Sequence, residues 1–242
     1  METFIGCSGF YYANWKGRFY PERIPGNRWL HYYSTIFNTV EINNTFYRMP
    51  EEKNLKSWMN QTPPDFKFTI KANRYFTHQK KLVIDDDFRK QLNNFTETIK
   101  VLDNKLGCML WQLPGNLHKD ISKLKELCIL LNHPIDHIFE FRHPSWFTEE
   151  IFTLLSEHNI GYCMLSAPGG LPEIARATAS TAYLRFHGKQ AWYRYNYSEE
   201  ELKTWHNRIE NLKNLTKIFV YFNNDYDARA VENAKMLIRM FE

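Results

Sequence analysis

Polar side chains recur at every second position in several short apolar segments of this sequence. In Val40-Glu41-Ile42-Asn43, for example, the apolar and polar residues alternate. The same pattern singles out Glu41, Asn43, Lys71, Glu140, Arg142, Arg185, His187, Tyr221 and Asn223. Carboxylates and imidazoles can exchange protons, whereas lysine and arginine bind phosphate and carboxylate groups. This combination indicates acid–base chemistry on an anionic substrate.

Short apolar strands alternate with amphipathic helices along the whole chain. We expect strands at residues 3–7, 39–43, 67–71, 105–112, 137–142, 161–165, 181–187 and 217–223. We expect helices at residues 29–37, 51–60, 88–102, 121–131, 149–158, 200–212 and 228–240. Residues 166–173 are rich in Pro and Gly, so a loop should replace the helix after the sixth strand.

Eight strand-and-helix units in 242 residues predict an α/β fold, a TIM (β/α)8 barrel that forms a single domain over residues 1–242. In such a barrel, catalytic side chains cluster at the carboxyl ends of the strands. The first strand ends in Gly6-Cys-Ser-Gly9, but this signal is weak and no acidic residue completes a dinucleotide site.

The alternation places five charged side chains inside the barrel. Glu41 and Glu140 contribute two negative charges, and Lys71, Arg142 and Arg185 contribute three positive charges, so one positive charge is in surplus. Buried charges are costly unless they pair or bind a ligand. An anionic small molecule, carrying a phosphate or carboxylate, would balance the surplus. The alternative is a closed Arg–Glu network that serves stability alone.

Composition favours a globular chain with no membrane segment. Hydrophobic residues make up 43% and charged residues 24% of the sequence, and the net charge is +4, which permits an anionic partner without requiring one. No apolar run approaches the roughly 18 to 20 residues of a membrane span, and the start lacks the features of a secretory signal. We therefore expect a cytoplasmic protein.

No cofactor is predicted. Strand-end acids and histidines could assemble a divalent metal site from Glu41, Glu140, His143 and His187. Local ligand spacing does not support such a site, and the neighbouring arginines would repel a cation.

Several ordered motifs resemble the domain of unknown function 72 family, also called YecE-like. They are residues 39–48 (TVEINNTFYR), 139–146 (FEFRHPSW), 183–188 (YLRFHG) and 221–225 (YFNND). The resemblance implies a TIM barrel in a bacterial family of uncharacterised activity. It also implies that Tyr47, His143 and Asn224 belong to the same surface as the residues chosen by alternation. Leu165-Ser166 stands where many relatives would carry an acidic residue, which weakens any mechanism that needs a third carboxylate.

The preferred hypothesis is an enzyme, a hydrolase or lyase, that acts on a phosphate-bearing or other anionic substrate. Glu41, Glu140 and His187 would move protons, because an imidazole near a carboxylate can titrate close to neutral pH. Substrate would be bound by Asn43, Tyr47, Lys71, Arg142, His143, Arg185, Tyr221, Asn223 and Asn224. Glycoside hydrolysis also uses two carboxylates, but three nearby cations fit a neutral sugar poorly.

Two alternatives stay open. Residues 74–81 and 192–197 mix cations with aromatic rings, which suits a protein that binds or processes nucleic acid. Ordinary solvated loops explain these tracts equally well. An interaction protein without catalysis is the other alternative, against which the charges inside the barrel argue.

Overall fold

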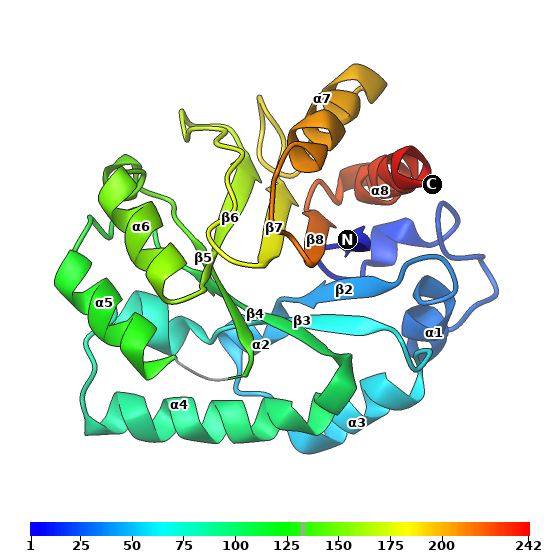
Figure 1. Ribbon diagram of the computed structural model, residues 1–242. Helices are drawn as coiled ribbons and strands as arrows, with labels where there is room; N and C mark the ends of the chain where they lie inside the picture. The colour runs from blue at the N-terminus through cyan, green and yellow to red at the C-terminus, as the bar shows by residue number, and fades with distance from the viewer. Residues whose placement is uncertain (132–133) are drawn as a thin grey trace.

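Eight parallel strands close into a barrel in the computed structural model, which describes residues 1–131 and 134–242 (Figure 1). Each strand pairs with the next one in the sequence, and β8 pairs with β1. The strands are Glu2–Cys7 (β1), Thr39–Ile42 (β2), Lys67–Lys71 (β3), Leu106–Gln112 (β4), Asp136–Glu140 (β5), Gly161–Ser166 (β6), Thr181–Phe186 (β7) and Lys217–Phe222 (β8). The predicted TIM-type barrel is confirmed.

Helices surround the strands (Figure 1). They are Trp29–Tyr33 (α1), Asn44–Tyr47 (α2), Glu52–Asn60 (α3), Asp86–Ile99 (α4), Ile121–Leu130 (α5), Glu149–Glu157 (α6), Glu199–Glu210 (α7) and Arg229–Phe241 (α8). The segment between β6 and β7 contains no helix, as the Pro and Gly content predicts. The short α2 and a π-helix at Tyr75–Gln79 were not expected, because a single turn leaves no periodic pattern.

Three of the longer helices, α4, α5 and α7, begin at residues whose side chains satisfy free backbone N–H groups. The side chain of Asp85 accepts a hydrogen bond from Phe88 N at the start of α4, and Asp120 does the same for Lys123 N at α5. Ser198 and Glu201 form a reciprocal capping box at α7. These caps fix where each helix starts after its strand.

Side chains of the strands alternate between two apolar layers. Val40, Ile42, Phe139 and Leu184 belong to the cluster between strands and helices, whose buried members extend over the whole barrel exterior. A second cluster fills the barrel itself and includes Phe4, Cys108, Leu110, Cys163, Tyr183 and Tyr221. The predicted parity is confirmed, so the polar residues at alternate positions face the barrel axis.

Four strands end one or two residues before the predicted positions. The last residues of β2, β5, β7 and β8 are Ile42, Glu140, Phe186 and Phe222. Asn43, Arg142, His187 and Asn223 therefore follow strands instead of ending them. At His187 the chain leaves the sheet because Gly188 adopts a left-handed conformation, with φ of 109°. The polar side chains thus lie at the carboxyl rim of the barrel.

Helices long and apolar enough to cross a membrane are absent from the described part of the chain.

Candidate functional site

Arg185 lies between the two carboxylates that the sequence places inside the barrel. Its Nη2 donates to Glu41 Oε1 at 2.6 Å, and its Nη1 donates to Glu140 Oε2 at 2.5 Å. All three side chains are at most 1% exposed. Charge-assisted hydrogen bonds of this kind are strong, and they compensate the cost of burying the ions. Arg185 therefore connects β2, β5 and β7 near the carboxyl end of the barrel.

Glu41 has two further hydrogen bonds from neutral donors. The hydroxyl of Tyr183 donates to Glu41 Oε2 at 2.5 Å, and Ser8 Oγ donates to Glu41 Oε1. Ser8 Oγ in turn accepts from Asn43 Nδ2 at 2.8 Å and from Arg185 Nη2 at 3.0 Å. This carboxylate is thus held by Tyr183 and Arg185 of β7 and by Ser8, which follows β1.

Arg142 and His187 form the second part of the network. Arg142 Nε donates to Glu140 Oε1, and Arg142 Nη2 lies 2.9 Å from His187 Nε2. A guanidinium only donates, so Nε2 accepts and the proton of the neutral ring is on Nδ1. The atom nearest to His187 Nδ1 is Asn223 Nδ2, at 3.0 Å, and exchanging the oxygen and nitrogen of this amide gives the Nδ1 proton an acceptor.

Lys71 is bound differently from the arginines. Its Nζ donates to Gln112 Oε1 at 2.6 Å and lies 4.4 Å above the ring of Phe46. Within residues 1–131 and 134–242, no carboxylate forms an ion pair with this buried ammonium. Burial and the charge of Arg185 lower the pKa of Lys71 to about 7, against the weaker opposing effect of Glu140 and Glu41.

The same charges determine the protonation of Glu140 and His187. Burial raises the pKa of Glu140, but Arg142, Arg185 and Lys71 outweigh it and lower the pKa to about 2. Burial and these three cations lower the pKa of His187 well below its ordinary value. At neutral pH Glu140 is therefore ionised and His187 is neutral. The hypothesis of titration near pH 7 considers only the neighbouring carboxylate, whereas burial and then the three cations lower the pKa of His187.

Trp192 covers the mouth of the barrel above Arg142 and His187. The guanidinium carbon of Arg142 lies 4.6 Å from the indole centroid, and the His187 ring is 5.3 Å away. The segment turns at Gly188, where a Cβ atom would lie 2.3 Å from the carbonyl oxygen of Ala191. Only glycine fits this turn, which brings the indole back over the site.

Four of the predicted site residues lie outside the charged cluster. Tyr47 is 67% exposed on α2, and His143 stacks on His118 with ring centroids 3.9 Å apart. Tyr221 lies in the barrel interior, where its hydroxyl contacts Thr39 Oγ1 at 2.5 Å and Thr69 Oγ1 at 2.8 Å.

Asn224 is buried, and its Nδ2 donates to Tyr195 O at 2.8 Å. It therefore anchors the segment that carries Trp192. The structure brings the remaining predicted residues together, namely Glu41, Asn43, Lys71, Glu140, Arg142, Arg185, His187 and Asn223.

Sequence reasoning missed three residues of the cluster, namely Ser8, Gln112 and Tyr183. Ser8 lies just after β1 and Gln112 at the end of β4, both at inward positions. The alternation rule would therefore have identified them. Tyr183 also has inward parity, two residues before Arg185. Trp192 belongs to the tract 192–197 that the sequence singles out for its cations and aromatic rings, but its place over the cluster depends on the conformation of a loop.

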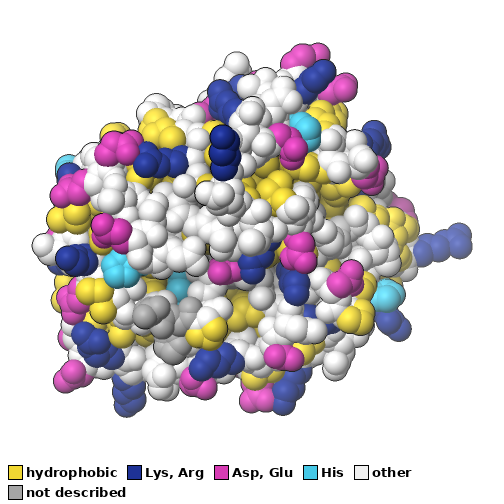
Figure 2. Space-filling view, in the orientation of Figure 1, with side chains coloured by type: hydrophobic (Ala, Val, Ile, Leu, Met, Phe, Trp, Pro, Cys, Tyr) yellow, Lys and Arg dark blue, Asp and Glu magenta, His cyan; other side chains and the backbone are white. Residues whose placement is uncertain are grey.

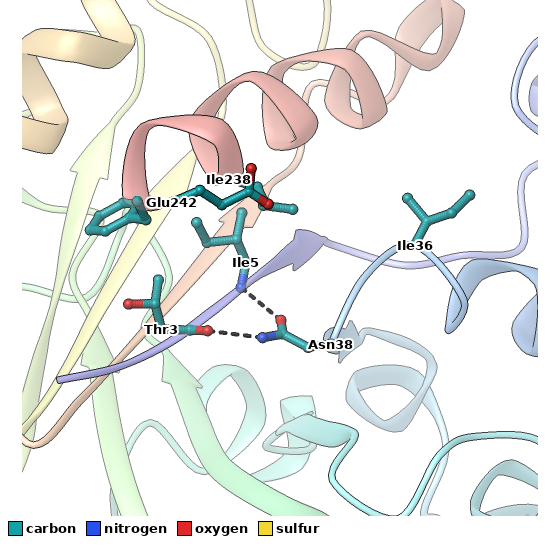
Figure 3. A pocket seen from close by; sticks show the side chains of 7 residues that line it. Thr3, Ile5, Ile36, Asn38, Ile238 and Glu242 are labelled. Atoms are coloured by element: carbon teal, nitrogen blue, oxygen red, sulfur yellow. Dashed lines mark hydrogen bonds between the residues drawn. The ribbon is translucent and has the colours of Figure 1, made fainter.

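Among the hollows of the described residues, two lie at opposite ends of the barrel. One, of about 440 Å³, adjoins Glu41 and Asn43 at the carboxyl end. The other, of about 290 Å³, is lined by Thr3, Ile5, Ile36, Asn38, Ile238, Phe241 and Glu242 (Figure 3). There the amide of Asn38 is already bonded to the β1 backbone, donating to Thr3 O and accepting from Ile5 N. The hollow beside Glu41 is therefore the one relevant to the charged cluster.

Groups of three or more His, Cys, Asp or Glu side chains arranged to share a metal ion are absent from the described residues. His143, one of the four candidates for such a site, bonds through Nδ1 to Ser145.

Comparisons with known proteins give a consistent result. A family model described as "Protein of unknown function DUF72" matches residues 4–242. The chain is 27% identical to the UPF0759 protein YunF of Bacillus subtilis (strain 168), over 92% of this chain and 90% of that protein.

Solved structures agree with the family match. A DUF72 family protein from Thermotoga maritima MSB8 is 33% identical, with a TM-score of 0.86, covering 100% of this chain and 99% of that one. A DUF72 family protein from Enterococcus faecalis V583 shares the fold at 18% identity, with a TM-score of 0.84, covering 98% and 94%. The chain therefore belongs to the DUF72 family.

Proposed function

We propose that this protein is an enzyme that binds a phosphate-bearing or other anionic small molecule at the carboxyl end of the barrel. The observation that carries the proposal is the buried ammonium of Lys71, which is held by the neutral amide of Gln112. Glu41 and Glu140 offset the charges of Arg142 and Arg185, so the protonated lysine is the surplus charge. A bound anion would supply the counter-charge.

The two arginines have different roles in this proposal. Both Nη atoms of Arg185 are bonded to carboxylates and the side chain is nearly inaccessible, so it holds Glu41 and Glu140 in place. The Arg142 side chain is 12% exposed and lies under Trp192, so it can turn toward a ligand at the mouth. Arg142 and Lys71 are accordingly the cations that would contact the anion.

The pKa values of the cluster support a proposal for which residues transfer protons. Lys71, with a pKa of about 7, can gain or lose a proton at neutral pH. Glu140 stays ionised and serves as the counter-ion of both arginines. Neutral His187 orients Arg142, and its low pKa makes it a poor base. Glu41 is kept as a candidate acid or base because it lies beside the adjoining hollow, although its carboxylate is fully buried.

A thermal unfolding comparison tests the proposal. The melting temperature is measured in phosphate and in chloride at matched ionic strength, for the wild type, Lys71→Met and the exposed-lysine control Lys90→Met. Phosphate stabilises many proteins by general exclusion from their surface, and this effect is common to all three proteins. We expect an extra rise in the wild type and in Lys90→Met, because a ligand of the folded state raises stability. Equal rises in all three proteins would refute the proposed site.

The nucleic-acid alternative has less support from the described contacts. In the tract 74–81, Lys80 Nζ pairs with Asp85 at 2.6 Å and with Asp87 at 3.6 Å, so its charge is already engaged. On the face shown in Figure 2, Lys and Arg side chains are interspersed with Asp and Glu. A nucleic-acid surface would favour a continuous stripe of cations.

A further inference from the structure

The hollow beside Glu41 has walls made largely of aromatic rings. It encloses about 440 Å³ and is lined by Phe10, Tyr11, Tyr12 and Trp58, together with Glu41 and Asn43. The loop after β1 supplies three of the rings, and α3 supplies Trp58. Tyr11 is 66% exposed, which is unusual for a ring that packs at 4.8 Å against Trp29. Aromatic walls of this kind favour a planar apolar group.

One hydrogen-bond acceptor at this wall, Asn43 Oδ1, has no donor among the described residues. The hydroxyl of Tyr12 donates to Ser8 O at 2.6 Å, so Tyr12 offers its ring and not a free hydroxyl. Asn43 Nδ2 donates to Ser8 Oγ, whereas Asn43 Oδ1 has no hydrogen-bond partner among the described residues. A buried carbonyl oxygen without a donor is costly. If the amide turned toward the hollow, an N–H group on the edge of a bound ring would satisfy Asn43 Oδ1.

The hollow is adjacent to the proposed anion site. Ile42 on β2 is in register with Ile70 on β3, and the next residues along these strands are Asn43 and Lys71. Neighbouring strands lie roughly 4.8 Å apart, so one small molecule can reach both residues. Another hollow, of about 370 Å³, adjoins the hollow beside Glu41, because Asn44 and Trp58 line both. It gives a bound ring further space.

We infer that the substrate carries a planar aromatic ring, with an N–H donor on its edge, joined to the phosphate or carboxylate that Lys71 binds. The ring lies against Tyr11, Tyr12 and Trp58, and the N–H donates to Asn43. This inference rests on the proposed function, because it extends the same anion site by one neighbouring subsite. Neither the family match nor the charged cluster itself specifies this part of the ligand.

Three probes of increasing size test the inference by calorimetric titration: inorganic phosphate, phenyl phosphate and 4-aminophenyl phosphate. Burial of a ring should strengthen the binding of phenyl phosphate roughly tenfold over inorganic phosphate. The amino group should add a further gain of roughly threefold, on the scale of one hydrogen bond, that is lost in Asn43→Leu. Affinity for inorganic phosphate should stay unchanged in Tyr11→Ala and Trp58→Leu, while the gain from the ring disappears.

Tyr226→Ala is the matched control, because Tyr226 is an exposed ring, 45% accessible, that does not line either hollow. It should retain the full preference for phenyl phosphate. If phosphate binds in a Lys71-dependent manner but the aromatic probes bind no more tightly, the ring subsite is overturned and the anion site stands. If none of the three probes binds the wild type, the anion site fails and the ring subsite fails with it. If Tyr226→Ala also loses the preference, the ring does not occupy this hollow.

Discussion

Lys71 Nζ donates to Gln112 Oε1 at 2.6 Å, so a buried ammonium is held by a neutral amide. The same barrel gives Arg185 two carboxylates, at 2.6 and 2.5 Å. This asymmetry separates two roles that the residue types alone do not distinguish. Arg185 belongs to an ionic network with two carboxylates that orders the barrel mouth. Lys71 has no carboxylate partner among the described residues, and with a pKa of about 7 it is the group that an anion would bind in its protonated form.

Loss of Arg185 should destabilise the fold strongly. Arg185→Met leaves Glu41 and Glu140 buried without their shared counter-ion, and removing one partner from such a network costs roughly 3–5 kcal/mol. The free energy of unfolding in urea measures this loss. Arg208→Met is the control, because its ion pair with Glu173 is partly exposed and should contribute at most about 1 kcal/mol. Equal small losses in both variants would show that the network is not stabilising the barrel.

Lys71 should make stability rise with pH above neutrality. Its pKa is about 7 in the folded state and 10.5 in an ordinary environment, so between these values the unfolded chain holds the extra proton. The free energy of unfolding therefore increases with pH over this range. The free energy of unfolding of the wild type minus that of Lys71→Met, measured from pH 7 to 9, should increase with pH. A constant difference would mean that Lys71 keeps its ordinary pKa.

His187 should weaken the fold as the pH falls. The unfolded chain protonates this residue below about 6.5, whereas the buried ring stays neutral to much lower pH. Stability is then lost with decreasing pH. We expect His187→Gln to show a shallower decline between pH 6.5 and 5 than the wild type in urea titrations. His31→Gln, an exposed control, should follow the wild type. The same slope in all three proteins would argue against a neutral His187.

Trp192 should control access to the cations below it. Its ring covers Arg142 at 4.6 Å, a cation–π contact worth roughly 0.5–2 kcal/mol. Trp192→Ala should lose stability on that scale and bind phosphate with a faster association rate in stopped-flow experiments. Trp192→Phe keeps an aromatic ring and should stay close to the wild type. An unchanged rate in the alanine variant would indicate that ligands enter by another route.

The alternation of residues in the strands accounts for most of what the sequence could predict. Parity alone placed Glu41, Glu140 and Arg185 inside the barrel, because a strand has a period of two and one face must meet the helices. The same rule would have found Ser8 and Gln112, had it been applied to the ends of β1 and β4.

Pairing and protonation lay beyond the sequence. Whether Arg185 or Lys71 forms the ion pairs with the carboxylates depends on how far each side chain extends across the barrel. Only the folded structure shows this. The low pKa of His187 likewise depends on Arg142 and Arg185 lying near it from different strands. Tyr221 shares the inward parity of Asn223 but points toward Thr39 and Thr69, because alternation does not tell how far up the barrel a side chain reaches.

The most direct measurement is a sulfate titration by calorimetry at pH 8, carried out in two buffers with different ionisation enthalpies. Sulfate does not itself titrate at this pH, so any proton taken up belongs to the protein. An anion next to Lys71 raises its pKa, and we therefore predict that sulfate binds with net proton uptake, and that Lys71→Met loses both the binding and the uptake. Sulfate binding without proton uptake, or uptake that persists in Lys71→Met, would contradict the assignment of Lys71 as the anion-binding residue.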